Sequence, residues 1–163
     1  MSKFMKAAVA SSVLAVSVMG ANAANAATAS ADARANILQQ VTVTSDGSDL
    51  DFGTIVSGAV ASTVAVSSAG AVTCGGGLVC SGATTAAGFD VTGTTGETVD
   101  VSSDAAVTLT GPTSTMTASL TPSAATILLD GTDAFTVGGT LNVGASQADG
   151  AYVGTFNVTV NYQ

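Results

Sequence analysis

The sequence predicts an all-β protein, built as a β-sandwich of short strands. Three observations lead to this fold class. Thr, Ser, Val, Ala and Gly dominate the composition, and only 9% of the residues are charged. The 19 glycines and two prolines are spread along the chain and divide it into short segments. Many of these segments alternate apolar and polar residues, which gives a strand one apolar and one polar face.

The first 26 residues have the features of a segment that is removed before folding. Lys3 and Lys6 precede an apolar run at residues 7–19, and small residues follow it. A positive head, a short apolar stretch and an A-x-A end are typical of a secretory signal peptide. We expect cleavage after Ala26, with Ala23 as the alternative, and therefore a secreted protein.

An N-terminal arm is predicted next, at residues 27–44, ahead of the sandwich domain at residues 45–163. The odd positions of the arm form an apolar row that only Gln39 breaks, whereas the even positions are mostly polar, with Leu38 as the exception. This alternation favours an extended arm in an assembled protein. Alanine also suits a helix, so a helical or disordered arm before assembly stays open.

The strands of the domain are predicted between clusters of turn-forming residues. Asp130-Gly131 favours a type I′ turn, so the segments on either side of it are expected to pair as a hairpin. Gly138-Gly139 is expected to mark a bulge or a bend. In chain order, the expected strands cover residues 50–56, 60–66, 71–73, 86–93, 98–102, 107–110, 115–120, 127–129, 134–137 with its continuation at 141–143, and 152–162.

The last of these strands, from Tyr152 to Tyr162, shows the clearest alternation. Its even positions are apolar or aromatic apart from Gly154, and its odd positions are mostly polar. The outer edge of this strand must be covered by a distant segment, be covered by another molecule, or stay open.

Cys74 and Cys80 are the two cysteines, and in a secreted chain they are expected to form a disulfide. The ring would enclose five residues, three of which are glycine. Because a ring of this size removes little chain entropy, we expect it to tighten the tip of a hairpin rather than to hold the fold together.

Composition argues against several classes of function. After residue 26, Arg34 is the one basic residue against eleven acids, and such a surface repels nucleic acids and anionic membranes. The chain has no histidine, which excludes Ser-His-Asp and Cys-His catalysis, so we expect neither an enzyme nor a bound cofactor. Two acidic clusters could offer oxygen ligands to calcium, but they lack the EF-hand spacing and are better explained as turn residues. These clusters are Asp46, Asp49 and Asp51, and Asp130 and Asp133.

Two family resemblances refine the fold. The last strand resembles the end of chaperone–usher pilins, in which a glycine stands fourteenth from the C-terminus and a tyrosine is penultimate; here these are Gly150 and Tyr162. The mature chain as a whole resembles a domain-of-unknown-function family of small secreted Gram-negative β-proteins. The segments that carry this second resemblance are residues 50–58, 87–93, 135–141 and 154–162.

The pilin resemblance implies an immunoglobulin-like sandwich that lacks its final strand, beside an apolar groove. It also implies a periplasmic chaperone that fills the groove first, an outer-membrane usher, and the arm of the next subunit as the final occupant. Such strand addition takes its affinity from backbone hydrogen bonds and its register from alternate side chains. The implied donor row is Ala31, Ala33, Ala35, Ile37 and Val41, and the implied acceptor strand carries Gly150, Phe156, Val158, Val160 and Tyr162.

Two functions are therefore expected. The first is a structural subunit of an extracellular, fimbrium-like surface filament, in which copies join head-to-tail by donor-strand exchange without closing into a ring. The alternative is a monomeric secreted or periplasmic module that binds carbohydrate or a surface partner. In that case residues 28–43 would form the first strand of their own complete sandwich.

Overall fold

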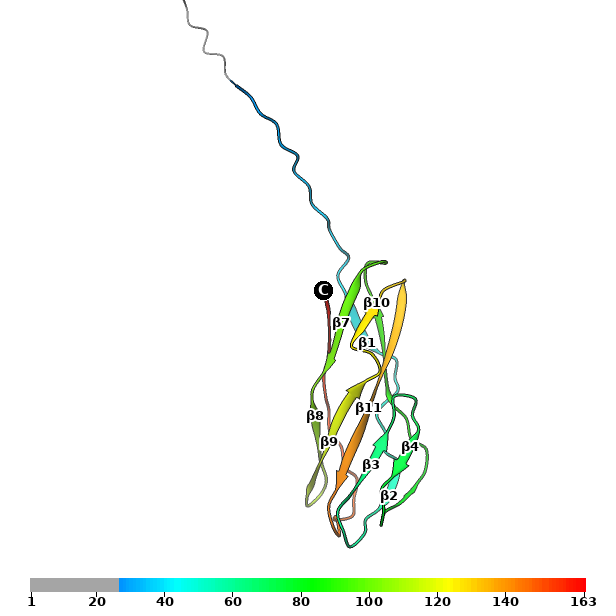
Figure 1. The fold of residues 1–163 in the computed structure, drawn as a ribbon. Helices are drawn as coiled ribbons and strands as arrows, with labels where there is room; N and C mark the ends of the chain where they lie inside the picture. Colours follow the sequence, from blue (N-terminus) through cyan, green and yellow to red (C-terminus); the bar gives the residue numbers. More distant parts are fainter. Residues whose placement is uncertain (1–26) are drawn as a thin grey trace, which may run out of the picture. The chain divides into compact units, whose positions relative to one another are not determined.

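The computed structural model describes residues 27–163, and the strands of this part of the chain lie between Thr42 and Tyr162 (Figure 1). The predicted signal peptide lies outside the described residues. Residues 27–163 contain strands but no helix, so the predicted all-β fold is confirmed. The strands are β1 (Thr42–Ser45), β2 (Thr54–Val56), β3 (Ser62–Val66), β4 (Val72–Cys74), β5 (Val79–Ser81), β6 (Ala87–Thr92), β7 (Thr98–Ser103), β8 (Ala106–Thr110), β9 (Thr115–Pro122), β10 (Thr126–Leu128), β11 (Thr132–Val143) and β12 (Val158–Tyr162).

The strands form a sandwich whose two layers are joined along one side. The first layer contains β1-β6-β11-β3-β4, and the second is built on β10-β7-β12; all pairs are antiparallel. β9 joins the layers, because it pairs with β11 on one edge and with β8, the continuation of β7, on the other. A two-stranded ribbon, β2-β5, completes the structure.

The opposite side of the sandwich has no such connection. One border of this open side is the C-terminal segment, in which Val153 bridges to Thr110 of β8 and β12 pairs with β7. The other border is β1, followed along the chain by β2. Among the described residues, no backbone hydrogen bond joins β1 or β2 to residues 150–162.

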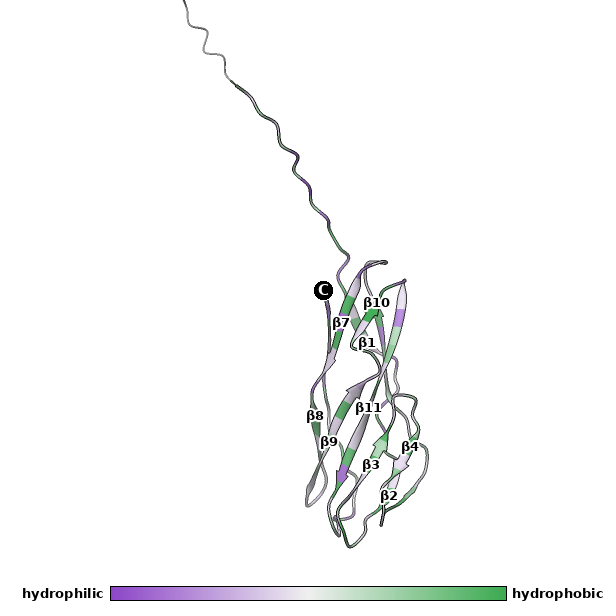
Figure 2. Ribbon diagram, viewed as in Figure 1, coloured by the Kyte–Doolittle hydropathy of each residue, from purple (hydrophilic) through white to green (hydrophobic). Residues whose placement is uncertain are grey.

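Alternating side chains fill the space between the layers. Apolar residues alternate with polar ones along β9 and β11, for example (Figure 2). Phe89 stacks on Phe135 with ring centroids 5.3 Å apart, and the ring of Phe156 meets Phe89 edge-on at 6.3 Å. Edge-on aromatic pairs of this kind add to the burial of apolar area. Phe156 therefore packs into the core from the C-terminal border.

The predicted hairpin around Asp130-Gly131 does not form, and this prediction is wrong. β10 pairs with β7 in the second layer, whereas β11 pairs with β6, β3 and β9. The intervening Leu129 is buried, and its backbone bonds to Gly96 and Glu97 instead. Burial of Leu129 thus makes the chain cross from one layer to the other at this turn.

Gly138 and Gly139 lie within β11, which continues through them as one strand. At this point the neighbour on one edge of β11 changes from β6 to β3. A Cβ atom on Gly138 would lie 2.5 Å from the carbonyl oxygen of Val66, and one on Gly139 would lie 2.8 Å from that of Ser119. The two glycines therefore allow neighbouring backbones to approach closely, in place of the expected bulge or bend.

Strand boundaries differ from the prediction at both ends of the domain. β12 begins at Val158, whereas the predicted strand begins at Tyr152; residues 154–157 belong to no strand. Gly154 lies tightly against β8, where a Cβ atom would be 2.4 Å from the carbonyl oxygen of Thr108. Near the N-terminus, residues 42–44 form most of β1 instead of the end of the arm, and Val43 packs against the core.

Candidate strand-acceptor groove

β12 presents a free backbone edge to the open side. In an antiparallel ladder, alternate residues turn both their N–H and C=O groups toward the same neighbour. Asp104 N donates to Asn157 O and Gln163 N donates to Thr98 O, so the odd-numbered positions of this segment face β7. The backbone groups that point into the open side are therefore those of Val158, Val160 and Tyr162.

The same even-numbered positions direct their side chains into the core. Val160 is only 7% exposed, and Phe156, Val158 and Tyr162 are partly buried against the core residues. The period-two alternation predicted for this segment is thus present in the structure. One row supplies both free hydrogen-bonding groups and an apolar surface, which are the two features that an added strand recognises.

β1 presents a similar edge on the facing border. Asp46 N donates to Gly88 O, which places the even positions of β1 toward β6. Val43, at an odd position, therefore turns its backbone groups toward the open side. Its side chain and that of Val41 pack against the core.

A cavity of ≈ 720 Å³ opens between the two borders at the end of the sandwich that carries the ribbon. One wall is formed by residues 52–57, which include β2, and the other wall is formed by residues 147–152. The floor is apolar and consists of Leu109, Met116, Leu141 and Val143. We use the term groove for this cavity together with the open side between β12 and β1. One border of the groove is the segment that contains β1 and β2, and the other is the C-terminal segment that leads into β12.

Tyr162 lies at the end of the groove away from the cavity. Its hydroxyl oxygen accepts a hydrogen bond from Thr94 N at 2.7 Å, and the hydroxyl donates to Gln39 O at 2.7 Å. A Cβ atom on Gly93 would lie 2.5 Å from the Tyr162 hydroxyl oxygen, so glycine leaves room for the tyrosine. Gln39 N in turn donates to Thr94 Oγ1 at 2.6 Å. The tyrosine thus fixes the point at which the chain enters β1.

Gly150 and Tyr152 shape the end of the groove that contains the cavity. Gly150 has a φ of +135°, a conformation that favours glycine, and it lies against the ring of Pro112. The ring of Tyr152 covers Gly111, and its hydroxyl donates to Ala148 O at 2.8 Å. These contacts hold the C-terminal wall of the cavity in place.

The Cys74–Cys80 disulfide is present, with the two Cα atoms 6.0 Å apart. It does not cap a single hairpin, because Cys74 lies in β4, which pairs with β3, whereas Cys80 lies in β5, which pairs with β2. The bond therefore attaches the ribbon to the edge of the first layer. Since β2 is a wall of the cavity, the disulfide helps to position that wall.

The predicted donor row is divided between two parts of the chain. Ala31, Ala33 and Ala35 lie in the described residues ahead of Asn36, which are exposed and adopt neither helix nor strand. Ile37 is 90% exposed. Val41, by contrast, packs against the core of its own chain, so it does not belong to a free arm. The free part of the row therefore ends at Ile37.

The acidic residues near β1 and β2 are tied into turns. Ser48 N donates to Asp46 Oδ1, and Gly53 N donates to Asp51 Oδ1, both at 2.7 Å. Across residues 27–163, no three His, Cys, Asp or Glu side chains gather in a group that could hold a metal ion. The same residues include no helix of the length and hydropathy that a membrane span requires.

Comparison with protein families gives a match that covers the sandwich. Residues 41–162 match the family described as Domain of unknown function (DUF4402). The chain belongs to this family. The matched region begins immediately before β1 and ends with the last residue of β12, so both borders of the groove lie inside it. The resemblance to a domain-of-unknown-function family is confirmed, whereas the resemblance to chaperone–usher pilins stays a prediction. No curated protein and no solved structure matches the chain.

Proposed function

We propose that this protein is a structural subunit of an extracellular, pilus-like filament, in which the N-terminal arm of one copy completes the sandwich of the next. The observation that carries the proposal is the open side of the sandwich. β12 and β1 both turn free backbone groups toward it, and the cavity beside it has an apolar floor. An added strand meets both needs at once, because it supplies backbone partners and alternate apolar side chains.

The arm matches the row that it would meet. Residues directly opposite each other in an antiparallel pair lie on the same face and exchange hydrogen bonds at alternate positions. Ala31, Ala33, Ala35 and Ile37 form a row with the same spacing as Phe156, Val158, Val160 and Tyr162. A register that places odd arm positions opposite even positions of the C-terminal segment would satisfy the backbone groups and bury the apolar row together.

An exchange between copies is favoured over insertion of the arm into its own groove. Gln39 is held by hydrogen bonds to Thr94 and Tyr162, and β1 starts at Thr42. To enter its own groove, the arm would have to reverse direction within residues 37–41. This stretch contains no Gly, Pro, Asn or Asp, the residues that favour tight turns. Exchange between copies is head-to-tail and generates an open filament.

A self-complemented variant tests the proposal. Residues 28–38 are joined after Gln163 through a Gly-Ser linker, in a chain whose own N-terminal arm has been deleted. We expect this variant to stay monomeric and to melt at a higher temperature than the arm-deleted chain without the fusion. The unmodified chain from residue 27 should form filaments that electron microscopy detects. The matched control carries Ala33→Asp and Ile37→Asp in the fused segment. Equal melting temperatures for the two fusions, with no filaments from the unmodified chain, would refute the proposal.

A second candidate function, a monomeric secreted or periplasmic binding module, is favoured by the cavity itself. Its volume of ≈ 720 Å³ lies in the range of small-molecule sites, about 300–1,000 Å³. A module of this kind would bind a carbohydrate in the cavity and would stay monomeric with its arm intact. Thermal stabilisation of the monomer by a small glycan, unchanged when residues 27–36 are deleted, would favour this second function over the first.

A further inference from the structure

The β2-β5 ribbon is an uncharged and apolar element at one end of the sandwich, and Asp149 on the facing wall is the charged residue that lines the cavity beside it. Residues 52–89 contain no Asp, Glu, Lys or Arg. Val56 and Val79 lie directly opposite each other in the ribbon, yet they are 58% and 63% exposed. Val60, in the turn after β2, is 72% exposed. Grouped exposed apolar side chains are typical of interaction surfaces. We call Val56, Val60 and Val79 the ribbon face.

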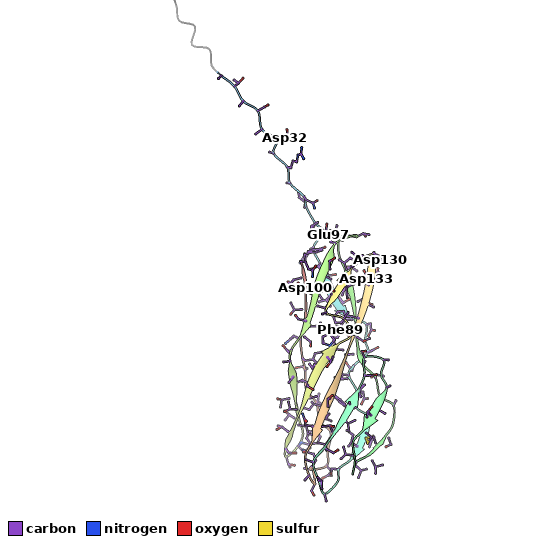
Figure 3. The ribbon with its side chains drawn as sticks, in the orientation of Figure 1. Asp32, Phe89, Glu97, Asp100, Asp130 and Asp133 are labelled. Atoms are coloured by element: carbon purple, nitrogen blue, oxygen red, sulfur yellow. A yellow bond between two sulfur atoms is a disulfide. The ribbon has the colours of Figure 1, made fainter. Side chains whose placement is uncertain are left out.

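The other end of the sandwich is acidic. Figure 3 shows Glu97, Asp100, Asp130 and Asp133 gathered toward the end at which β7 and β11 begin. The segment that leads into β1 is fixed at this same end, since Gln39 is bonded to Tyr162 and Thr94. The two ends therefore differ in charge, and the arm is attached at the acidic one.

We infer that the ribbon face is a second contact between neighbouring copies, and that it packs against the acidic, arm-bearing end of the copy whose arm is inserted. The inference rests on the proposed function. Its first support is the distribution of side-chain size in the arm. Ile37 is the one bulky member of the free row, and the other members are alanine. The cavity beside the ribbon is the part of the groove with room for it, so Ile37 belongs there.

The length of chain between Ile37 and β1 then positions the neighbour. Five peptide steps from Ile37 to Thr42 span at most about 17 Å even when fully extended. A copy whose Ile37 occupies the cavity must therefore hold its own sandwich next to the ribbon, with its arm-bearing end foremost. In this arrangement the inserted arm runs antiparallel to the C-terminal segment, from Tyr162 toward Gly150.

Charge supports the same orientation. Two acidic ends placed together would bring several carboxylates close to each other, whereas the ribbon is uncharged and Asp149 is the one acid that lines the cavity beside it. Apolar area is available on both partners, because Leu128 near the acidic end is 66% exposed. The contact joins the ribbon face of one copy to the acidic end of its neighbour, and such a contact between two different surfaces propagates a filament.

The test compares filament growth with arm binding in the same variants. Val60→Asp with Val79→Asp places two charges on the ribbon face at positions that do not line the cavity. A fluorescent peptide of residues 28–40 measures the groove alone, and light scattering of the chain from residue 27 measures filament growth. We expect growth to slow about tenfold or more, which corresponds to about 1.4 kcal/mol, while the affinity for the peptide stays unchanged. The matched control is Thr108→Asp with Thr117→Asp, an exposed cross-strand pair on β8 and β9, which should grow normally.

A second variant protects the test against misfolding. Val60→Thr with Val79→Thr keeps the β-branched shape and removes apolar surface, so it should also slow growth. This variant carries the test if the aspartate variant does not fold. Normal growth of the folded ribbon variants, with normal peptide binding, would overturn the inference and leave the proposed function standing. Failure of the peptide to bind the unmodified chain would overturn the proposed function, and the inference with it.

Discussion

Ile37 offers the sharpest separation between a role in folding and a role in assembly. Its side chain is 90% exposed in the chain that carries it, so it contributes little to the stability of that chain. Replacing an exposed residue usually changes the free energy of unfolding by no more than about 0.5 kcal/mol. The substitution Ile37→Ala should therefore leave the urea midpoint of the isolated chain almost unchanged.

The same substitution should weaken the joint between copies strongly. Full burial of an isoleucine contributes about 1.5–3 kcal/mol, and loss of a buried isoleucine also leaves unfilled space. If Ile37 fills the cavity of a neighbour, Ile37→Ala should cost about 2–3 kcal/mol of binding. Since about 1.4 kcal/mol corresponds to a tenfold change, the affinity of the arm peptide should fall about 30- to 150-fold.

Fluorescence anisotropy with labelled peptides of residues 28–40 measures this change directly. Asn36→Ala in the same peptide is the control, because residue 36 belongs to the polar row that would face solvent. The reasoning is refuted if Ile37→Ala and Asn36→Ala peptides bind equally well, or if Ile37→Ala destabilises the isolated chain as much as it weakens binding.

Three further substitutions test the geometry of the groove. Replacing Cys74 and Cys80 together by serine should lower the free energy of unfolding by about 2 kcal/mol in urea titrations, the value expected for a ring this small, and an unchanged urea midpoint would contradict the calculation. Tyr162→Phe keeps the ring but removes the hydroxyl bonded to Thr94 N and Gln39 O, so calorimetry should show a loss of about 1–3 kcal/mol; no loss would mean that these bonds are not formed in solution. Gly154→Ala should lower the free energy of unfolding by about 1–3 kcal/mol, because the added Cβ atom would lie 2.4 Å from Thr108 O. The control Gly76→Ala should be nearly neutral, because no atom lies within 4 Å of the added Cβ atom. Similar melting temperatures for these two variants would show that the close contact at Gly154 is absent.

The strands were largely predictable because their signal is local. Alternation in residues 98–102, 107–110 and 115–120 locates β7, β8 and β9 to within a few residues, and the row through Phe156, Val158 and Val160 has the predicted inward orientation. Alternation reports which face of a strand is apolar, and the face does not depend on distant residues.

The connections between strands were harder to predict, because they depend on burial in three dimensions. Asp130-Gly131 has the composition of a hairpin turn, but burial of the preceding Leu129 directs β10 to the other layer. The sequence did not indicate that β2 forms a wall of the cavity. β2 has only three residues, too few for an alternating pattern to show which side of the strand faces the cavity. Nothing in the local sequence around Cys74 and Cys80 indicates that their strands pair with different partners.

Amide hydrogen exchange at β12 tests the central claim most directly. In the isolated chain, the amides of Thr159 and Asn161 face β7 and should exchange slowly, whereas those of Val158, Val160 and Tyr162 face the groove and should exchange fast. Addition of the peptide of residues 28–40 should slow exchange at these three groove-facing amides. Fast exchange that persists at saturating peptide, or slow exchange of all five amides in the isolated monomer, would contradict the account of an open edge that a second copy fills.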